Sequence, residues 1–347
     1  ARVGDDLWAQ GVLEFLRGKQ QGRCAQGLPT FEASVEADPS DGPRQLFVAT
    51  LRALHRRTAE AEESYEAAIA AAPACKDAYL ELALFLEAQG RRDAALEVAR
   101  RAVAAGAYWA DPWQRPPMFF PGLRSKPWWP REDFPWAETL EASWRDIKRE
   151  MLRLCSVTKS EDMPGSWPKV GEERATQDGD IIAPGGEWRE YVLFGVGPGG
   201  DAAQDAPRTC ALLEELLPGA VAMAKIGAGE IIFSALAPGT RLVPHCASSN
   251  TRLTCHLGLS CPSGPRLRVG PEWGAWEEGK CLFFDDSFEH EVEHPGTAPR
   301  VVLLIRFWHP DLPEERWLPT LEAGMEEFNA LQQRRAWPPL SPAVEAA

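Results

Sequence analysis

The sequence predicts a multidomain α + β protein, in which α-helical repeats are followed by a small β-barrel of the jelly-roll or cupin-like kind. Residues 1–106 are rich in Ala, Leu, Glu and Arg and repeat at an interval of about 34 residues, which is typical of stacked helical pairs. From residue 186 onward, short β-branched and aromatic runs are separated by Gly and Pro turns. Five of the six histidines fall between residues 245 and 309, and such clustering indicates a metal site.

Composition limits the classes of function. The chain has 347 residues, of which 44% are apolar, so it can form two domains with buried cores. Its net charge of −14 and the lack of a Lys/Arg stripe argue against a nucleic-acid partner, because binding to phosphates needs a basic face. No apolar run reaches membrane-spanning length and no signal peptide opens the chain. The eight cysteines contain no C-x-x-C pair, and a disulfide is compatible with them but not required.

Residues 1–106 are the predicted repeat domain. Small and apolar residues recur at matching positions of two units, each offset by the same interval: Ala61, Tyr65, Ala68 and Ile69, then Ala95, Ala99, Ala102 and Val103. Pro73 closes one unit, and a third unit ending at Pro39 follows the same pattern. Small residues where two helices touch, with a closing Pro, are typical of the tetratricopeptide repeat (TPR). An ordinary helical bundle is the alternative, and either structure predicts a scaffold or a surface that binds partners.

Residues 107–136 are predicted to form a connector rich in Trp and Pro. Proline disfavours both regular helix and central strand, so we expect an extended strap that lays aromatic rings across the junction between domains. A helix is expected over about 137–154, where apolar residues recur at helical spacing.

Residues 137–320 are the predicted β domain, and residues 321–347 a C-terminal helix and tail. The strand candidates are short runs between turns: residues 191–194, 231–235, 253–259, 266–269, 281–284 and 301–308. A short helix is expected at 210–217. Another is expected over about 318–334, before a Pro-rich tail that we expect to be disordered.

Two histidines stand where a small barrel can bring side chains together. His245 follows a Pro-Gly-Thr turn and ends one expected strand, and His290 ends another strand further along the chain. Arg300 opens the next strand, from which a guanidinium can reach inward and grip a carboxylate with paired hydrogen bonds. Two strand-end histidines with a downstream Arg are typical of a non-haem Fe(II) oxygenase that uses 2-oxoglutarate. The usual carboxylate ligand comes two residues after the first His, where this chain has Ala247.

Over roughly residues 107–320 the sequence resembles the aspartyl/asparaginyl β-hydroxylase family. The matching segments are Pro-Gly-Leu at 121–123 through Trp129, Pro-Gly-Thr at 238–240 with Pro244-His245, Asn250 with His-Leu-Gly-Leu at 256–259, residues 276–292, and Trp-His-Pro at 308–310. The resemblance implies a double-stranded β-helix oxygenase domain, and animal members also carry helical repeats ahead of it. The family lacks the carboxylate ligand, so Ala247 agrees with the resemblance.

The resemblance also implies roles for individual residues. His245 and His290 would bind Fe(II), and Asp286 would hydrogen-bond to a water on the iron. Ser234 and Arg300 would bind the distal carboxylate of 2-oxoglutarate, and His256 would lie beside this co-substrate. Each has a structural alternative. The histidines can be hydrogen-bonded core residues, Arg300 a surface ion pair, and Asp285 with Asp286 the shapers of the turn before His290.

The remaining histidines and two cysteines have no predicted ligand role. His294 is expected at the surface, and His309 is expected to cap a strand end beside Pro310. Cys246 and Cys255 are interpreted as structural thiols, since strand alternation turns Cys255 away from the face of its histidine neighbour.

Two positions depart from the animal members and leave the substrate open. Thr254 stands where they have Arg and Ile232 where they have Lys, although Arg252 lies on the face of Thr254 and can compensate. The leading expectation is hydroxylation by O₂ of an Asp or Asn β-carbon in a protein substrate such as an EGF-like domain, docked partly through the repeats. The less basic pocket also suits a fatty acyl or other small-molecule substrate. A non-catalytic interaction protein is a third alternative.

The compartment also stays open. The resemblance implies the endoplasmic reticulum lumen, behind a membrane anchor that this chain does not contain. If the chain is complete as given, a cytoplasmic location is expected instead.

Overall fold

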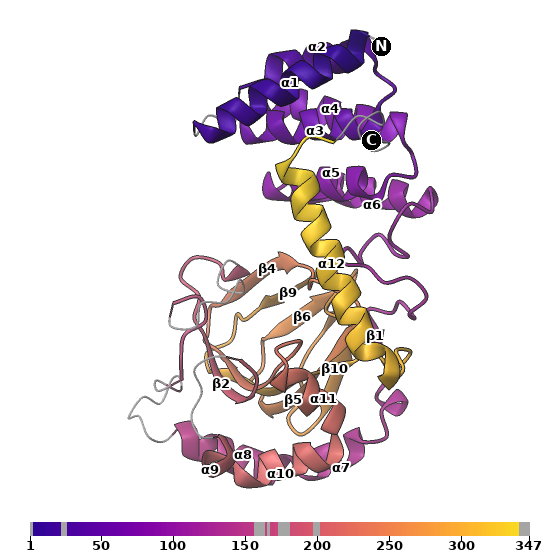
Figure 1. Cartoon of the computed structure of the whole chain (residues 1–347). Coiled ribbons are helices and arrows are strands. Elements are labelled where there is room, and N and C mark those ends of the chain that lie inside the picture. Colours follow the sequence, from indigo (N-terminus) through magenta and orange to yellow (C-terminus); the bar gives the residue numbers. More distant parts are fainter. Residues whose placement is uncertain are drawn as a thin grey trace. The chain divides into compact units, whose positions relative to one another are not determined.

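The computed structural model describes residues 3–21, 26–155, 164, 167–172, 181–196 and 202–339. The chain divides into two compact units, one made of Ala1–Pro112 with Glu322–Ala347 and the other of Trp113–Leu321 (Figure 1). The first unit is helical, and the second combines antiparallel sheets with helices. The chain therefore has the mixed α and β composition that its sequence predicts.

Helical pairs with a fixed spacing build the first unit. Its helices are α1 Val3–Gln20, α2 Leu28–Ala37, α3 Gly42–Leu54, α4 Thr58–Ala71, α5 Lys76–Ala88, α6 Arg92–Ala104, and most of α12 Trp317–Ala336. In order along the chain, α1 packs on α2, α3 on α4 and α5 on α6. The starts of α3 and α5 are separated by the predicted repeat interval, as are those of α4 and α6. Ala61 and Ala95, which mark the repeat, are fully buried, because only a small side chain lets two helices approach so closely.

Local signals explain where several of these helices start and turn. Asp41 caps α3, its carboxylate accepting a hydrogen bond from the Arg44 backbone N–H at 3.0 Å. Gly90 adopts a φ of 73° in the turn between α5 and α6, a conformation that glycine adopts most readily. Trp8 packs on Phe31 with ring centroids 4.5 Å apart at the centre of the first two pairs. Aromatic burial of this kind supplies much of the apolar area that such a small core needs.

The described residues of the second unit include ten strands, which form two antiparallel sheets. They are β1 Trp128–Trp129, β2 Trp188–Phe194, β3 Ile231–Leu236, β4 Arg241–His245, β5 Arg252–Ser260, β6 Arg266–Val269, β7 Glu272–Gly274, β8 Cys281–Phe284, β9 His290–Glu293 and β10 Arg300–Trp308. Among the described residues one sheet has the order β1-β8-β5-β10-β3-β2, and the other the order β4-β9-β6-β7. All six predicted strand candidates are present, and β4 ends at His245 as expected. The prediction that His290 ends a strand was wrong, because His290 opens β9 after a turn.

Strand alternation divides the core of this unit into two parts. Odd-numbered residues of β3, β5 and β10, such as Phe233, Leu257 and Leu303, pack with the helices on one face of the larger sheet. Even-numbered ones, such as Ile232 and Val302, pack with residues of the smaller sheet. The polar even-numbered residues of these strands therefore face the space between the two sheets.

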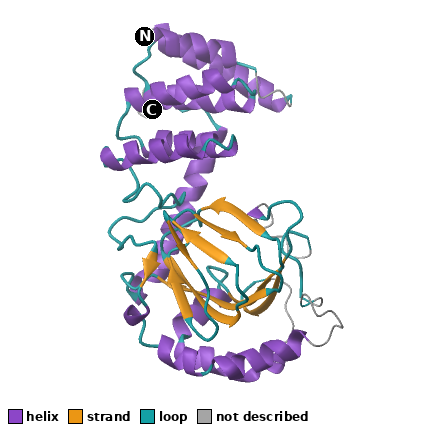
Figure 2. Ribbon diagram, turned by 180° about the vertical axis from the view of Figure 1, so that it is seen from behind, coloured by secondary structure: helices purple, strands orange, loops and turns teal. Residues whose placement is uncertain are grey.

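Helices cover the outer face of the larger sheet (Figure 2). They are α7 Ala137–Ala142, α8 Trp144–Cys155, α9 Ala202–Asp205, α10 Pro207–Leu216 and α11 Pro218–Lys225, and short 3-10 turns occur at Arg131–Asp133 and Glu314–Arg316. The single helix predicted over 137–154 is divided at Ser143 into α7 and α8. The helix predicted at 210–217 is longer and is followed by α11, because Pro218 cannot continue α10 and instead starts a new helix.

The connector and the C-terminal tail also differ in part from expectation. Trp128–Trp129 pairs with β8, so part of the predicted strap is an edge strand of the larger sheet. Helix α12 is slightly longer than predicted and includes Arg335 and Ala336. Residues 340–347, which belong to the tail expected to be disordered, lie outside the described residues.

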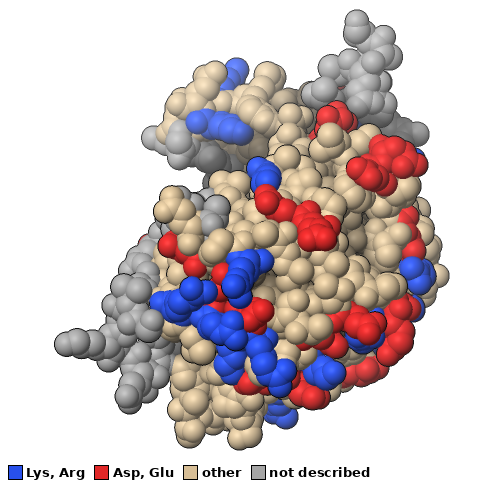
Figure 3. Space-filling model, turned by 90° about the horizontal axis from the view of Figure 1, so that it is seen from below, with Lys and Arg blue, Asp and Glu red and all other residues tan. Residues whose placement is uncertain are grey.

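Basic and acidic side chains are mixed on the surface of the second unit. On the face drawn in Figure 3, a small group of Lys and Arg side chains lies next to Asp and Glu side chains. On α8, Lys148 pairs with Glu278 and Arg149 with Asp146, so the helix carries its positive charges beside negative ones. Within the described ranges, none of the helices is long and apolar enough to cross a membrane.

Candidate active site

A cavity between the two sheets collects the polar residues of both. Its lining includes the six predicted site residues, the departing position Thr254 and two residues that were not singled out: Ser234, His245, His256, Asp286, His290 and Arg300, then Thr254, then Trp188 and Arg306. The apolar residues that complete the wall come from both sheets. The fold thus brings together side chains as far apart in the sequence as Trp188 and Arg306.

The two imidazoles lie side by side on neighbouring strands of the smaller sheet. His245 on β4 is the register partner of His290 on β9, and their ring centroids are 4.1 Å apart. His245 Nδ1 lies 2.7 Å from the carbonyl oxygen of Val243, and His290 Nδ1 lies 2.9 Å from that of Phe288. Because a carbonyl only accepts, each Nδ1 carries the proton and each Nε2 keeps its lone pair. Burial lowers the pKa of His290, which favours the neutral ring that a metal requires.

This pair can hold a metal, but with few protein ligands. Within the described part of the chain, no group of three or more His, Cys, Asp or Glu side chains is arranged to hold a metal ion. Ala247, at the usual position of a carboxylate ligand, only donates its backbone N–H to the carbonyl oxygen of Asp286, at 2.8 Å. A metal bound here would therefore leave most of its coordination positions to small molecules.

Arg300 is a buried cation to which none of the described residues offers an acidic partner. Its exposed fraction is 3%, and its Nε and Nη1 atoms have no hydrogen-bond partner. The guanidinium lies 4.7 Å from the centre of the Trp276 ring, and burial lowers its pKa to about 10, so it stays charged at neutral pH. Burying an unpaired charge is costly, and a carboxylate is the group that a guanidinium matches best. The surroundings of Arg300 therefore fit an anionic ligand.

Ser234 and His256 face the same cavity from the strands that flank β10. The Ser234 hydroxyl accepts a hydrogen bond of 2.9 Å from Trp188 Nε1, which leaves its own proton to donate. His256 Nδ1 accepts a bond of 3.0 Å from Trp276 Nε1, so the neutral ring carries its proton on Nε2. His256 Nε2 is buried without a partner, and burial followed by the charge of Arg300 holds the pKa of His256 well below its usual value. Both side chains can donate to an anion near Arg300.

Asp286 is the carboxylate of the cavity, whereas Asp285 shapes the turn. Asp286 Oδ2 accepts from Thr254 Oγ1 at 3.1 Å and from Arg306 Nη1 at 2.6 Å, while Oδ1 has no partner. Burial alone raises the pKa of Asp286, but the nearby positive charges, Arg306 first, outweigh it, and the pKa is lowered. Asp285 accepts from the Ser287 backbone and hydroxyl, and burial raises its pKa to about 8.

Comparison with known proteins agrees with this arrangement. Residues 141–310 match the sequence profile described as aspartyl/asparaginyl beta-hydroxylase. Those residues are therefore a domain of this family. The human aspartyl/asparaginyl beta-hydroxylase is 34% identical over 215 residues, which is 60% of this chain and 26% of that protein. The human aspartate beta-hydroxylase domain-containing protein 2 is 34% identical over 207 residues, 57% of this chain and 52% of that protein.

The chain therefore spans about a quarter to about half the length of these relatives. A solved prolyl-4-hydroxylase from Pseudomonas putida aligns with 51% of this chain and 89% of its own, at 16% identity and a TM-score of 0.29. A superposition this loose supports no argument about fold or activity.

The two departures from the animal members of the β-hydroxylase family have different surroundings. Ile232 is fully buried in the apolar cluster between the sheets. Thr254 is the register partner of Arg306 on β10. A guanidinium from the neighbouring strand therefore lies beside the position where the animal members have Arg. Arg252 Nη1 donates to the carbonyl oxygen of Ala228 at 2.9 Å, and its charge also helps to lower the pKa of Asp286.

Sequence reasoning missed the two tryptophans and Arg306. The signal for Arg306 was available, because alternation from Arg300 puts residues 302, 304 and 306 on the same face of β10. Trp188 and Trp276 gave no such signal, since their partners lie 46 and 20 residues away.

The prediction that His294 lies at the surface was wrong. Its exposed fraction is 1%, because the end of β9 pairs with the turn before β4 through a bond of 3.0 Å from the His294 backbone N–H to the Thr240 carbonyl. His309 directly follows β10, and its Nε2 lies 3.0 Å from the Arg124 carbonyl oxygen. The His309 ring therefore connects the end of β10 to the segment at Arg124.

A buried network of ion pairs holds the segment in front of His290. The Glu289 carboxylate forms ion pairs with Arg115, at an N–O distance of 2.5 Å, and with Arg268, at 2.7 Å. Glu289 and Arg115 are both buried from solvent. Arg268 also pairs with Glu291. The residues on both sides of His290 are therefore anchored by charge, which fixes the position of its ring.

Proposed function

We propose that this protein is an Fe(II)- and 2-oxoglutarate-dependent dioxygenase that hydroxylates the β-carbon of Asp or Asn residues in a protein substrate. The observation that carries the proposal is the unpaired Arg300 guanidinium, buried in the same cavity as the His245–His290 pair. A fold tolerates a lone buried cation where a ligand supplies the missing anion. Family membership supports the same chemistry.

The finer description of the fold belongs to this proposal. We infer that the two facing sheets form a double-stranded β-helix, or jelly roll, which the antiparallel pairing and the strand order support. We infer that the helical pairs of the first unit are TPR-like repeats, which the constant offset between helix starts and the buried alanines support.

Each cavity residue has a task in this reaction. His245 and His290 would hold Fe(II) through Nε2, with both rings oriented by backbone carbonyls. Arg300 and Ser234 would bind the distal carboxylate of 2-oxoglutarate, and His256 would donate from Nε2 to the same co-substrate. The free Oδ1 of Asp286 would accept a hydrogen bond from water. Bound Fe(II) and 2-oxoglutarate would supply the activation of O₂.

An Asp or Asn side chain in a protein is the leading substrate. Arg306 and Arg252 bring positive charge to the side of the cavity where Thr254 lacks it. An EGF-like domain docked partly through the repeats fits this proposal. Ile232 favours the second candidate, a fatty acyl or other small-molecule substrate, because an apolar residue of the cluster between the sheets stands where the animal members have Lys. A non-catalytic interaction protein would need no unpaired cation in its barrel.

The test is the conversion of 2-oxoglutarate to succinate by the purified chain with Fe(II), compared with His290→Ala. Turnover that requires His290 and rises with an EGF-like peptide, which gains about 16 Da by oxygen insertion, supports the proposal. Turnover that ignores the peptide but rises with an acyl substrate supports the second candidate. Iron binding with no succinate formed contradicts both.

A further inference from the structure

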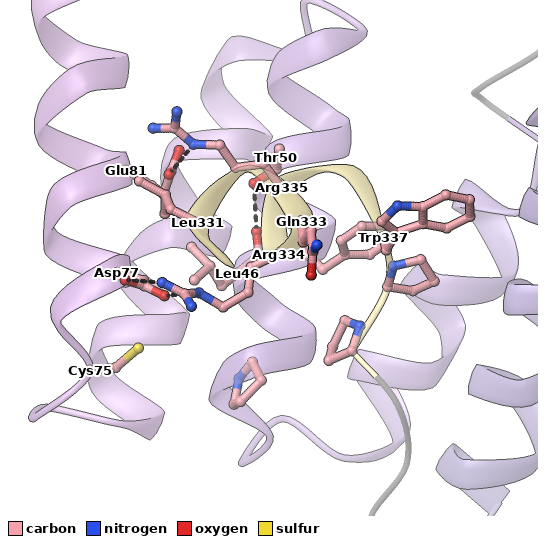
Figure 4. A pocket seen from close by; sticks show the side chains of 14 residues that line it. Leu46, Thr50, Cys75, Asp77, Glu81, Leu331, Gln333, Arg334, Arg335 and Trp337 are labelled. Atoms are coloured by element: carbon pink, nitrogen blue, oxygen red, sulfur yellow. Dashed lines mark hydrogen bonds and ion pairs between the residues drawn. The ribbon is translucent and has the colours of Figure 1, made fainter. Parts of the chain in front are cut away.

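The C-terminal half of α12 packs against the first helix of the helical pairs in the first unit. It and the residues that follow contact α1, α3 and α5, the first helix of each pair (Figure 4). Leu331 is buried there, and a cavity of about 470 Å³ remains between α12, α3 and α5. In stacked helical repeats, the row of first helices forms the surface available to a peptide. In this chain the C-terminal segment itself covers the surface formed by these first helices.

Acidic residues of α5 recognise the basic end of this segment. Arg335 Nε lies 2.5 Å from Glu81, and Arg334 Nε lies 2.6 Å from Asp77 (Figure 4). The side chains of Glu81 and Asp77 are only 11% and 14% exposed. They are four residues apart, on one face of α5. Burial raises the pKa of Glu81 and Arg335 opposes it, so this acid depends on a cation being present.

An aromatic ring and prolines complete the contact. Lys19 lies 3.5 Å from the centre of the Trp337 ring, and Trp8 Nε1 donates to the carbonyl oxygen of Pro339 at 2.9 Å. The side of the remaining cavity that belongs to α3 is mainly apolar and includes Leu46 and Phe47. The groove therefore offers two acids and an apolar wall to a segment that contains adjacent arginines, an aromatic residue and proline.

Part of the C-terminal segment is open to solvent, which lets another segment compete for its contacts. Trp337 is 46% exposed and the Arg334 side chain 43% exposed. Ion pairs and aromatic contacts that solvent reaches contribute little to stability. A segment of the same chemistry on another protein can therefore compete with it.

We propose that this groove is a docking site for a partner protein that presents two adjacent arginines followed by an aromatic residue and proline. Residues 334–339 occupy the site in cis and act as a competing ligand. The inference concerns the repeat unit alone and goes beyond the proposed oxygenase function. It can therefore stand or fail independently of that chemistry.

The test uses the full chain and a fluorescein-labelled peptide with the sequence of residues 332–339, followed by fluorescence anisotropy. In the variant Arg334→Glu/Arg335→Glu the cis segment is repelled, so the peptide should bind about tenfold or more tightly than to the unaltered chain. Adding Asp77→Asn/Glu81→Gln should abolish that gain. The matched control is Glu322→Arg/Glu326→Arg, which changes two exposed charges of α12 outside the groove and should leave binding as in the unaltered chain.

Three results would overturn the proposal. The first is equal peptide binding by all variants. The second is a gain that survives the loss of Asp77 and Glu81. The third is a dimer of the unaltered chain that dissociates in the charge-reversed variant, because the occupant would then be a second copy. Trp337→Ala, which keeps both arginines, should give a smaller gain of the same sign, so the test survives if the charge-reversed variant does not fold.

Discussion

Polar atoms without partners mark the cavity at the scale of single residues. Arg300 and His256 each leave donor atoms unmatched, and Asp286 leaves an acceptor unmatched. Other unmatched atoms, such as the ring nitrogens of His294, are scattered through the described residues, but these three side chains line one cavity. Buried polar groups are nearly always paired, so this concentration indicates a place prepared for ligands. The sequence predicted Arg300 through its position at the start of a strand. It could not predict that no acid in the described part of the chain pairs with it, because that depends on the packing of distant strands.

The substitution Arg300→Met should weaken the binding of 2-oxoglutarate without destabilising the fold. Without the buried charge, the free energy of unfolding of the ligand-free chain should stay unchanged or rise by about 1–4 kcal/mol. Binding of 2-oxoglutarate should fall at least about a hundredfold, since its carboxylate loses a charged partner. Chemical denaturation and calorimetric titration in the presence of Mn(II) measure the two quantities. A large loss of stability would mean that Arg300 is a structural residue.

Trp276→Phe should act through His256. The ring remains for Arg300 to lie on, but the indole N–H that fixes the proton on His256 Nε2 is lost. We expect KM for 2-oxoglutarate to rise about threefold to tenfold with a smaller change in kcat, as for one lost hydrogen bond. Nitrogen NMR of the His256 ring should show a mixture of tautomers. An unchanged tautomer with impaired binding would show that Trp276 only fills space.

The alternation of strands explains what could be predicted at the scale of elements. Strand β10 contains a continuous apolar run, and β3 and β5 have apolar residues at their odd-numbered positions, so the positions of these strands were clear from the sequence. Strand β9 has the sequence His-Glu-Val-Glu, which contains one apolar residue and gives no such signal. Its existence depends on pairing with β4 and β6. Non-local pairing is also why His290 was assigned to the end of a strand.

Arg115→Met tests the buried ion pairs that anchor β9. Glu289 would keep only Arg268, and an incompletely paired buried carboxylate should cost about 3–5 kcal/mol in the free energy of unfolding. The control is Arg266→Met, which removes a partner of Glu293 from an exposed pair and should cost less than about 1 kcal/mol. Urea denaturation of both variants gives the comparison. Equal losses of stability in the two variants would show that burial does not make the ion pairs of Glu289 more stabilising than an exposed pair.

At the scale of the whole molecule, one unit is built from local repeats and the other from contacts between distant parts of the sequence. The repeat unit was predictable because each helical pair repeats its own local pattern, with Ala61 and Ala95 at equivalent positions. The cavity was predictable only in part, since it joins residues of both sheets through contacts far apart in the sequence. The resemblance to a family supplied the candidates for this part, and the two sheets collect them around one cavity.

Metal and co-substrate should stabilise the chain together. Two imidazoles alone are a weak site, whereas a chelating acid held by Arg300 would complete the coordination. Mn(II) with 2-oxoglutarate should therefore raise the unfolding midpoint by more than the sum of the separate increases. EDTA should reverse the effect, and His290→Ala should remove it. Simple addition of the two increases in a thermal unfolding series would contradict a shared site.

The residues around the cavity are divided between the sheets by task. His245 and His290 come from β4 and β9 of the smaller sheet, whereas Ser234, His256 and Arg300 come from the larger one. Under the proposed function, mutations in the three strands of the larger sheet should alter the binding of 2-oxoglutarate and leave the binding of metal to the smaller sheet unchanged. A lineage of such enzymes could then change the acid that it consumes and keep its metal site.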